Sequence, residues 1–115
     1  MQTSKKLSTL DEEQLLDQFY TVLCEFSQPD EMQSFLFSFL TPTERLVFAK
    51  RLQIAWLLHQ GKSYDEIAKQ LNVSSATISS VAENKDSDGM MKAIEKLALE
   101  NKAESTLNKF TFWKR

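Results

Sequence analysis

A chain of 115 residues with 42% hydrophobic and 26% charged residues has the composition of one globular domain rather than of a disordered segment. It contains two glycines and two prolines, too few for the tight turns of an all-β fold, so we expect helices. Cys24 is the single cysteine, and the polar N-terminal stretch lacks the apolar segment of a signal peptide, which together favour a cytoplasmic protein. No apolar stretch reaches the roughly 20 residues of a membrane-spanning helix, so we expect no membrane role.

The net charge of −2 conceals an uneven distribution of charge. Lysines and arginines number two against seven acidic residues in 1–40, six against four in 41–85, and six against five in 86–115. The positive excess therefore lies in the middle of the chain. An excess of two permits DNA binding without demanding it, because domains that bind DNA through charge alone are usually far more basic.

Two helices are expected in the acidic N-terminal third. Apolar residues recur at helical spacing over about 12–26, and Asp11 followed by Gln14 resembles a capping box at the start of this helix. Asp30 is then placed to cap a second helix over 30–40. The aromatic side chains of both helices are interpreted as packing surface.

The third expected helix has a clear signal at each end. Thr41 is placed as its N-cap, Pro42 occupies the favoured first position, and Glu44 completes a capping box. Gly61, about five turns later, can adopt the left-handed conformation that commonly ends a helix. Apolar residues over 46–58 cover most of the circumference of this helix, so we expect a second copy of the chain to bury what one copy cannot.

The next segment has the pattern of a helix, a short turn and a second helix. Ser63 and Glu66 form another capping box, Asn72 tolerates the left-handed conformation of a sharp turn, and Ser74 can cap the second helix. The segment from about Tyr64 to Glu83 therefore predicts a helix-turn-helix. The side chains expected to hold its two helices together are Ile67, Leu71, Val73, Ile78 and Val81, with the small Ala68 at the crossing.

The outer face of the second helix carries small side chains, most of them hydroxyls. Such residues let a helix lie deep in the major groove of double-stranded DNA, although each contact discriminates weakly between bases. The predicted DNA-binding residues are Lys62, Ser63, Lys69, Ser74, Ser75, Ala76, Thr77, Ser79, Ser80 and Lys85. Lys50 and Arg51 are further candidates for phosphate contacts, and we expect weak, strongly salt-dependent binding.

Several motifs in residues 40–81 occur together in one known family. They are Thr41-Pro42, Glu44-Arg45, Arg51, Gly61-Lys62-Ser63-Tyr64, Glu66-Ile67-Ala68 and Ser75-Ala76-Thr77-Ile78-Ser79. In these the chain resembles the Trp repressor family, and more closely its bacterial Trp-repressor-like branch, often labelled YerC/YecD. A weaker likeness, in the number and order of the flanking helices, includes one expected over 90–100.

The resemblance implies an all-α fold of about six helices that forms an intertwined homodimer with a helix-turn-helix head on each chain. It implies one domain over residues 1–104, and we expect 105–115 to be a basic and aromatic tail, either packed on the dimer or acting as an accessory nucleic-acid arm. The implied function is that of a sequence-specific transcriptional regulator, a repressor, whose partners are double-stranded DNA and a second copy of the chain.

Tryptophan-responsive members of the family hold their ligand with a threonine, two arginines and a serine. Thr41 and Arg51 match the first two positions, whereas Ser80 replaces the second arginine and Asn84 stands where the serine would be. These four residues form the possible ligand site that the resemblance implies. The missing guanidinium argues against tryptophan as a co-repressor, and we predict no cofactor.

The sequence contains no pattern typical of catalysis or metal binding. It has no Cys/His cluster with zinc spacing and no glycine-rich phosphate loop. His59 is expected to be a partly exposed residue at a helix end, far in sequence from Cys24. We therefore predict no enzyme activity, no catalytic residues and no metal.

Two other functions remain open at this point. A DNA-targeting subunit of a transposase or recombinase would carry a similar helix-turn-helix, although the helices expected to form a dimer favour a regulator. A helical protein-interaction module with a degenerate helix-turn-helix would explain the acidic N-terminal third, and would explain Ser80 and Glu83 at positions where positive charge is usual. Binding to random duplex DNA separates the DNA-binding functions from the interaction module.

Overall fold

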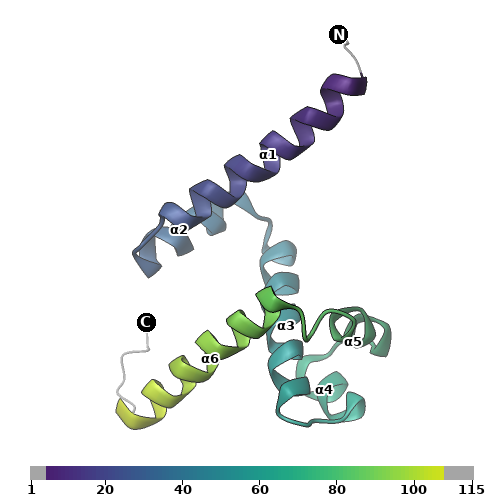
Figure 1. Ribbon diagram of the computed structural model, residues 1–115. Helices are drawn as coiled ribbons and strands as arrows, with labels where there is room; N and C mark the ends of the chain where they lie inside the picture. Colours follow the sequence, from purple (N-terminus) through teal and green to yellow (C-terminus); the bar gives the residue numbers. More distant parts are fainter. Residues whose placement is uncertain (1–4, 108–115) are drawn as a thin grey trace. The chain divides into compact units, whose positions relative to one another are not determined.

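The computed structural model describes residues 5–107 and is all α-helical over that range, as the sequence predicts. Within it the chain forms six helices and no strand, labelled as in Figure 1: α1 (Lys5–Glu25), α2 (Pro29–Phe39), α3 (Pro42–His59), α4 (Tyr64–Leu71), α5 (Ser75–Ala82) and α6 (Asp88–Leu107). Contacts divide the chain into an N-terminal unit, residues 1–45, and a C-terminal unit, residues 46–115. None of the helices in residues 5–107 is both long and apolar enough to cross a membrane.

A row of stacked aromatic rings joins α1 to α2 in the N-terminal unit. Ring centroids lie 5.3 Å apart between Phe26 and Phe35, 4.9 Å between Phe35 and Phe39, and 5.7 Å between Phe39 and Phe19. Offset aromatic pairs at such distances contribute about 0.5–1.5 kcal/mol each beyond their buried area. These four phenylalanines pack against one another as predicted, whereas Tyr20 and Phe37 of the same helices remain mostly exposed.

The corner between α2 and α3 is held by a single arginine. Arg45 Nη1 donates hydrogen bonds to the carbonyl oxygens of Phe37, at 2.9 Å, and of Leu40, at 3.0 Å. Its guanidinium carbon lies 4.3 Å from the centroid of the Phe37 ring, within the range of a cation–π contact. These bonds satisfy carbonyl groups that the end of α2 leaves without an intrahelical partner.

The predicted start signals of the first two helices are wrong. α1 begins at Lys5, so Asp11 lies inside the helix and cannot cap it. Gln28 is the N-cap of α2 and Pro29 its first residue, which places Asp30 within the first turn. Proline suits this position because its φ is already helical and because an N–H there would have no partner within the helix. The Asp30 carboxylate, although it does not cap the helix, still interacts favourably with the positive end of the helix dipole.

The predicted limits of α3 are confirmed. Thr41 N–H donates to Glu44 Oε1 at 2.9 Å, and Glu44 N–H donates to Thr41 Oγ1 at 3.1 Å, which together form the expected capping box. At the other end Gly61 has a φ of 84°, and the following N–H, of Lys62, donates to the carbonyl of Leu57 at 3.0 Å. This left-handed residue turns the chain from α3 towards α4.

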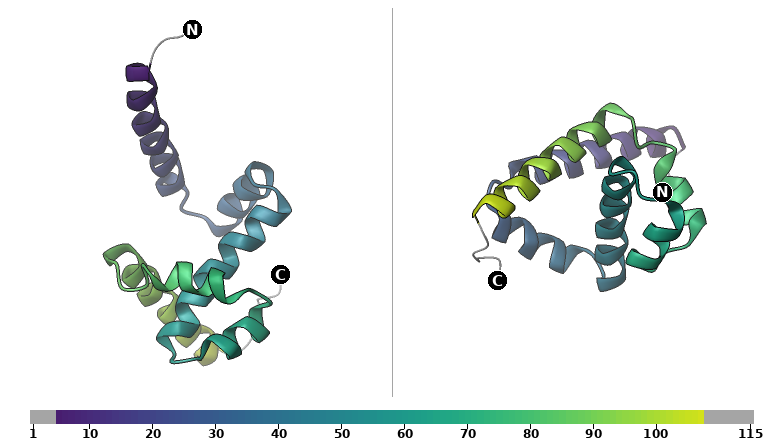
Figure 2. Two further views of the ribbon diagram at one scale, coloured as in Figure 1. Left: turned by 90° about the vertical axis from the view of Figure 1, so that its right-hand side faces the viewer. Right: turned by 90° about the horizontal axis from the view of Figure 1, so that it is seen from below.

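A small apolar core joins the helices of the C-terminal unit. Figures 1 and 2 show α4 and α5 meeting at a short turn beside α3. The fully buried side chains include Ile54 of α3, Ile67 of α4 and Ile78 of α5. The other buried residues are Ala55, Leu57, Val81 and Ile94, and the half-buried residues packed against them are Trp56, Leu58, Ala68, Leu71, Val73 and Met90. The predicted contacts between the helices of the helix-turn-helix are thus confirmed.

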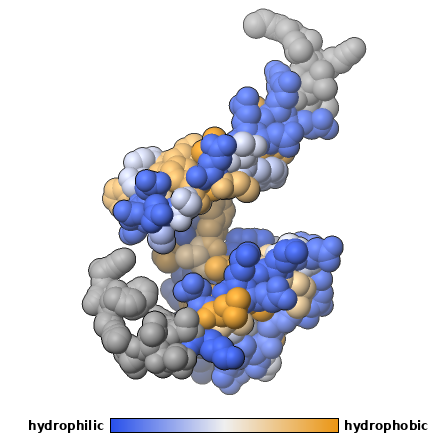
Figure 3. Space-filling model, turned by 60° about the vertical axis from the view of Figure 1, so that its left-hand side comes forward, coloured by the Kyte–Doolittle hydropathy of each residue, from blue (hydrophilic) through white to orange (hydrophobic). Residues whose placement is uncertain are grey.

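The first half of α3 leaves large apolar side chains uncovered. Leu46 is 56% exposed, Phe48 55%, Val47 46% and Leu52 38%. By contrast Trp56, further along the helix, packs against the core of its own chain. Figure 3 shows that apolar side chains also reach the surface in each unit. The expectation that a second copy covers this surface therefore concerns residues 46–52 rather than the whole of α3, and it stays a prediction.

Candidate nucleic-acid interface

The entry into α4 is fixed by reciprocal hydrogen bonds. Ser63 N–H donates to Glu66 Oε1 at 2.9 Å, and Glu66 N–H donates to Ser63 Oγ at 3.1 Å. The hydrogen bond from the Ser63 backbone holds the pKa of the Glu66 carboxyl below its ordinary value of 4.5, and the nearby charge of Lys62 lowers it further. The capping box predicted from the sequence is therefore formed with an ionised carboxylate at neutral pH.

The turn between α4 and α5 depends on one left-handed residue. Asn72 has φ 56° and ψ 57°, and its N–H donates to the carbonyl of Ala68. Asparagine adopts this conformation more readily than most residues that carry a side chain, which is why the turn could be predicted. Ser74 then caps α5, because its Oγ accepts from Thr77 N–H at 3.1 Å. The predicted turn residues are both confirmed.

The inner and outer faces of α5 differ sharply. Ile78 and Val81 are buried in the core, whereas the small residues on the other side are exposed. The exposed members of the predicted set on this helix and its cap are Ser74, Ser75, Ala76, Ser79 and Ser80. Thr77 is half-buried and its Oγ1 lies 3.0 Å from Ser74 Oγ, so its hydroxyl is already engaged within the cap.

Few positive charges surround this surface. Residues 62–85 contain the three lysines of the predicted set, balanced by three acidic residues, Asp65, Glu66 and Glu83. Lys62 and Lys69 are exposed, but Lys85 is half-buried and its Nζ lies 3.1 Å from Asp86 Oδ2. Lys50, on α3, is half-buried, and Arg51 is exposed. The arrangement offers phosphate contacts at scattered points rather than a continuous basic patch.

Two of the four predicted ligand residues line one pocket. Arg51 and Asn84 border a space of about 250 Å³ in the C-terminal unit, together with Phe48, Leu52, Val81 and Met90. Ser80 is exposed on α5 and does not line this pocket. Thr41 caps α3 in the N-terminal unit. The apolar walls were not predicted, although Phe48, Arg51 and Leu52 are spaced as neighbours on one helix face, a signal that could have suggested them.

No arrangement typical of a metal site occurs among the residues that the structure describes, since no three His, Cys, Asp or Glu side chains come together there. Cys24 is exposed on α1, and His59 ends α3 with its ring directed at the segment after α5. His59 is half-buried, as the sequence predicts for a helix-end residue.

A short capped helix, a left-handed turn and a second capped helix, held on a longer helix by a shared core, define a helix-turn-helix protein. The chain belongs to the Trp repressor family: the family model described as Trp repressor protein matches residues 14–105. No curated protein and no solved structure matches the chain. Members of the family are non-enzymatic regulators, and membership indicates a DNA-binding regulator with the Trp repressor-like fold.

The capping box of α4 makes a prediction about pH. Because folding lowers the pKa of Glu66, its carboxylate stabilises the folded state above the unfolded pKa of about 4.5, and this contribution is lost as the pH falls through the lowered value. Glu66→Gln keeps a side-chain oxygen that can accept the hydrogen bond from the Ser63 N–H, but the glutamine amide does not titrate. Thermal unfolding should therefore show the parent more stable at about pH 7, with the difference between the two proteins shrinking towards about pH 3. A constant difference over this range would contradict the role given to the carboxylate.

Proposed function

We propose that this chain is a sequence-specific transcriptional regulator, a repressor, that binds double-stranded DNA as a homodimer with α5 in the major groove. The proposal rests mainly on the outer face of α5, where exposed small side chains stand opposite the buried Ile78 and Val81. A helix with such a face can approach the groove floor closely. Family membership agrees with this function. We also propose that the protein is cytoplasmic and belongs to the Trp-repressor-like branch labelled YerC/YecD.

The second part of the proposal concerns assembly. A single chain leaves Leu46, Val47, Phe48 and Leu52 exposed along one part of α3, and surfaces of this kind are usually buried between subunits. A dimer would place two copies of α5 where they could reach successive major grooves.

We propose that residues 1–104 become one domain in this dimer. α6 continues into the predicted tail as far as Leu107, and residues 108–115 lie outside the described part of the chain.

The chemistry of the interface predicts modest affinity. Because the three lysines of residues 62–85 are matched by three acidic residues, few condensed counterions would be released when DNA binds. No exposed residue of α5 can make the bidentate contact to a base that arginine or glutamine makes. We therefore propose that specificity depends on two half-sites being read together.

The pocket beside Arg51 and Asn84 is the proposed place for any small-molecule effector. Tryptophan is disfavoured as that effector, because Ser80 supplies no guanidinium to cover an indole ring.

The assembly has a direct test in sedimentation equilibrium. The native chain should have twice the monomer mass of 13.3 kDa. Leu46→Asp places a charge in the proposed interface and should shift the protein towards monomer, whereas Leu46→Ala removes bulk without adding charge and should weaken the dimer less. Both variants should keep the helical circular dichroism of the parent. A native protein of monomer mass would contradict the dimer.

The DNA contact is tested by substitutions at Ala76, measured by fluorescence anisotropy on duplex DNA. Ala76→Glu adds bulk and a charge that repels phosphate, and it should weaken binding by about tenfold or more. Ala76→Gln adds similar bulk without the charge, and its amide can bind a base edge, so it should weaken binding less. Ala76→Ser should leave binding nearly unchanged. If a folded, dimeric Ala76→Glu variant binds as the parent does, α5 is not the recognition helix. If the parent itself fails to bind random duplex at about 10⁻⁴ M in low salt, the protein-interaction module replaces the proposed function.

A further inference from the structure

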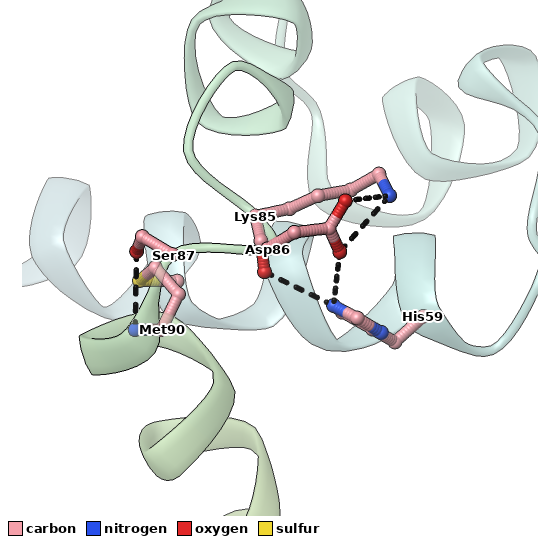
Figure 4. Close-up of polar contacts among 5 residues, drawn as sticks. All are labelled: His59, Lys85, Asp86, Ser87 and Met90. Carbon is pink, nitrogen blue, oxygen red and sulfur yellow. Dashed lines mark hydrogen bonds and ion pairs between the residues drawn. The ribbon is translucent and has the colours of Figure 1, made fainter.

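A side chain at the end of α3 holds the segment that follows α5. His59 Nε2 lies 3.2 Å from the carbonyl oxygen of Lys85, a residue 26 positions further along the chain (Figure 4). A carbonyl oxygen can only accept, so Nε2 carries a hydrogen and is the donor. The imidazole side chain is 21% exposed, so water competes little with this bond.

The held segment begins where the proposed recognition helix ends. Its backbone makes tight turns: Asn84 N–H donates to Val81 O at 3.1 Å, Lys85 N–H to Ala82 O at 3.3 Å, and Ser87 N–H to Asn84 O at 3.1 Å. These bonds are local, so they shape the segment without fixing it to the rest of the C-terminal unit. The buried Val81 and the core-packed Met90 anchor the chain on either side of the segment. The bond from His59 adds a direct polar attachment of the segment itself to α3.

Lys85 and Asp86 share the same corner. The Lys85 Nζ atom lies 3.1 Å from Asp86 Oδ2 and 3.4 Å from Asp86 Oδ1, and the His59 Nε2 atom lies 3.8 Å from Asp86 Oδ1 (Figure 4). Asp86 is 71% exposed and the Lys85 side chain 36% exposed, so their ion pair is weak and easily exchanged. A phosphate could therefore replace the Asp86 carboxylate as the partner of the ammonium group, because the competing pair lies largely in solvent.

We propose that His59 is a positioning residue for DNA binding, which fixes the backbone of Lys85 so that its ammonium group contacts a phosphate beside α5. This inference rests on the proposed function. A lysine on a free loop must lose backbone freedom when it binds, and a lysine on a fixed backbone has lost that freedom already. His59 thus touches no DNA and acts through the peptide group of Lys85.

The test compares folded variants in a salt titration of binding to random duplex DNA, followed by anisotropy. Lys85→Ala should weaken binding and make the slope of log affinity against log salt shallower by about 0.9, the value for one phosphate contact. His59→Leu removes the donor and should weaken binding by about threefold to tenfold, the range of one hydrogen bond. His59→Gln keeps a donor and should restore most of the affinity. In the Lys85→Ala background, His59→Leu should have no further effect, because the two residues act together.

Lys92→Ala is the charge-matched control, since Lys92 is an exposed lysine on α6. If this variant lowers the affinity and slope as much as Lys85→Ala does, net charge explains the effect and the proposal fails. Additive losses from His59→Leu and Lys85→Ala would also overturn it, as would unchanged binding by either variant. If His59→Leu does not fold, His59→Asn, whose side chain is too short to reach the carbonyl, takes its place. Absence of binding by the parent is a different result, because it contradicts the proposed function itself.

Discussion

The contact among Ile54, Ile67 and Ile78 is the interaction on which the rest of the C-terminal unit depends. Each isoleucine comes from a different helix, α3, α4 or α5, and each is fully buried. Burial of one such side chain contributes about 1.5–3 kcal/mol, and both α4 and α5 have only eight residues, too few to be stable helices alone. The orientation of α5, and hence the direction in which its small side chains face, follows from this contact.

The small core leaves part of α3 without a covering surface. α3 supplies Ile54, Ala55 and Leu57 to the core from its second half, while Leu46 to Leu52 in its first half stay largely exposed. A helix that is apolar around most of its circumference cannot be buried by two short helices, so a further surface is required. The apolar residues of α3 therefore serve two purposes. Those in its second half anchor α4 and α5, and those in its first half are the surface on which the proposed dimer depends.

The sequence predicted best those features that depend on neighbouring residues. Thr41 with Glu44, Ser63 with Glu66, and Ser74 with Thr77 are hydrogen-bonded pairs three positions apart. The starts of α3, α4 and α5 could therefore be predicted from local chemistry. The same type of signal failed at Asp11 and Asp30, because α1 begins earlier and Pro29 takes the first position of α2. A capping residue alone does not show which of several adjacent starts is used.

Contacts between distant residues could not be predicted from local patterns. Arg51 and Asn84 were placed in one site through the family resemblance, and they do line one pocket, but its wall at Met90 comes from α6 and has no local signal. The hydrogen bond from His59 to Lys85 likewise spans 26 positions and depends on how α3 packs against the segment after α5. Such features become visible only when the packing of the helices is known.

The most direct measurement is a titration of the isotopically labelled protein with random duplex DNA at low salt, followed by the chemical shifts of its backbone amides. If α5 lies in the major groove, the largest shifts should occur in residues 74–80. Smaller shifts are expected at the exposed Lys62, just before α4, and at the exposed Lys69, within α4. The amides of α1 and α2 should move little. Shifts concentrated in α1 and α2, or none at all up to about 10⁻⁴ M, would contradict DNA recognition by α5.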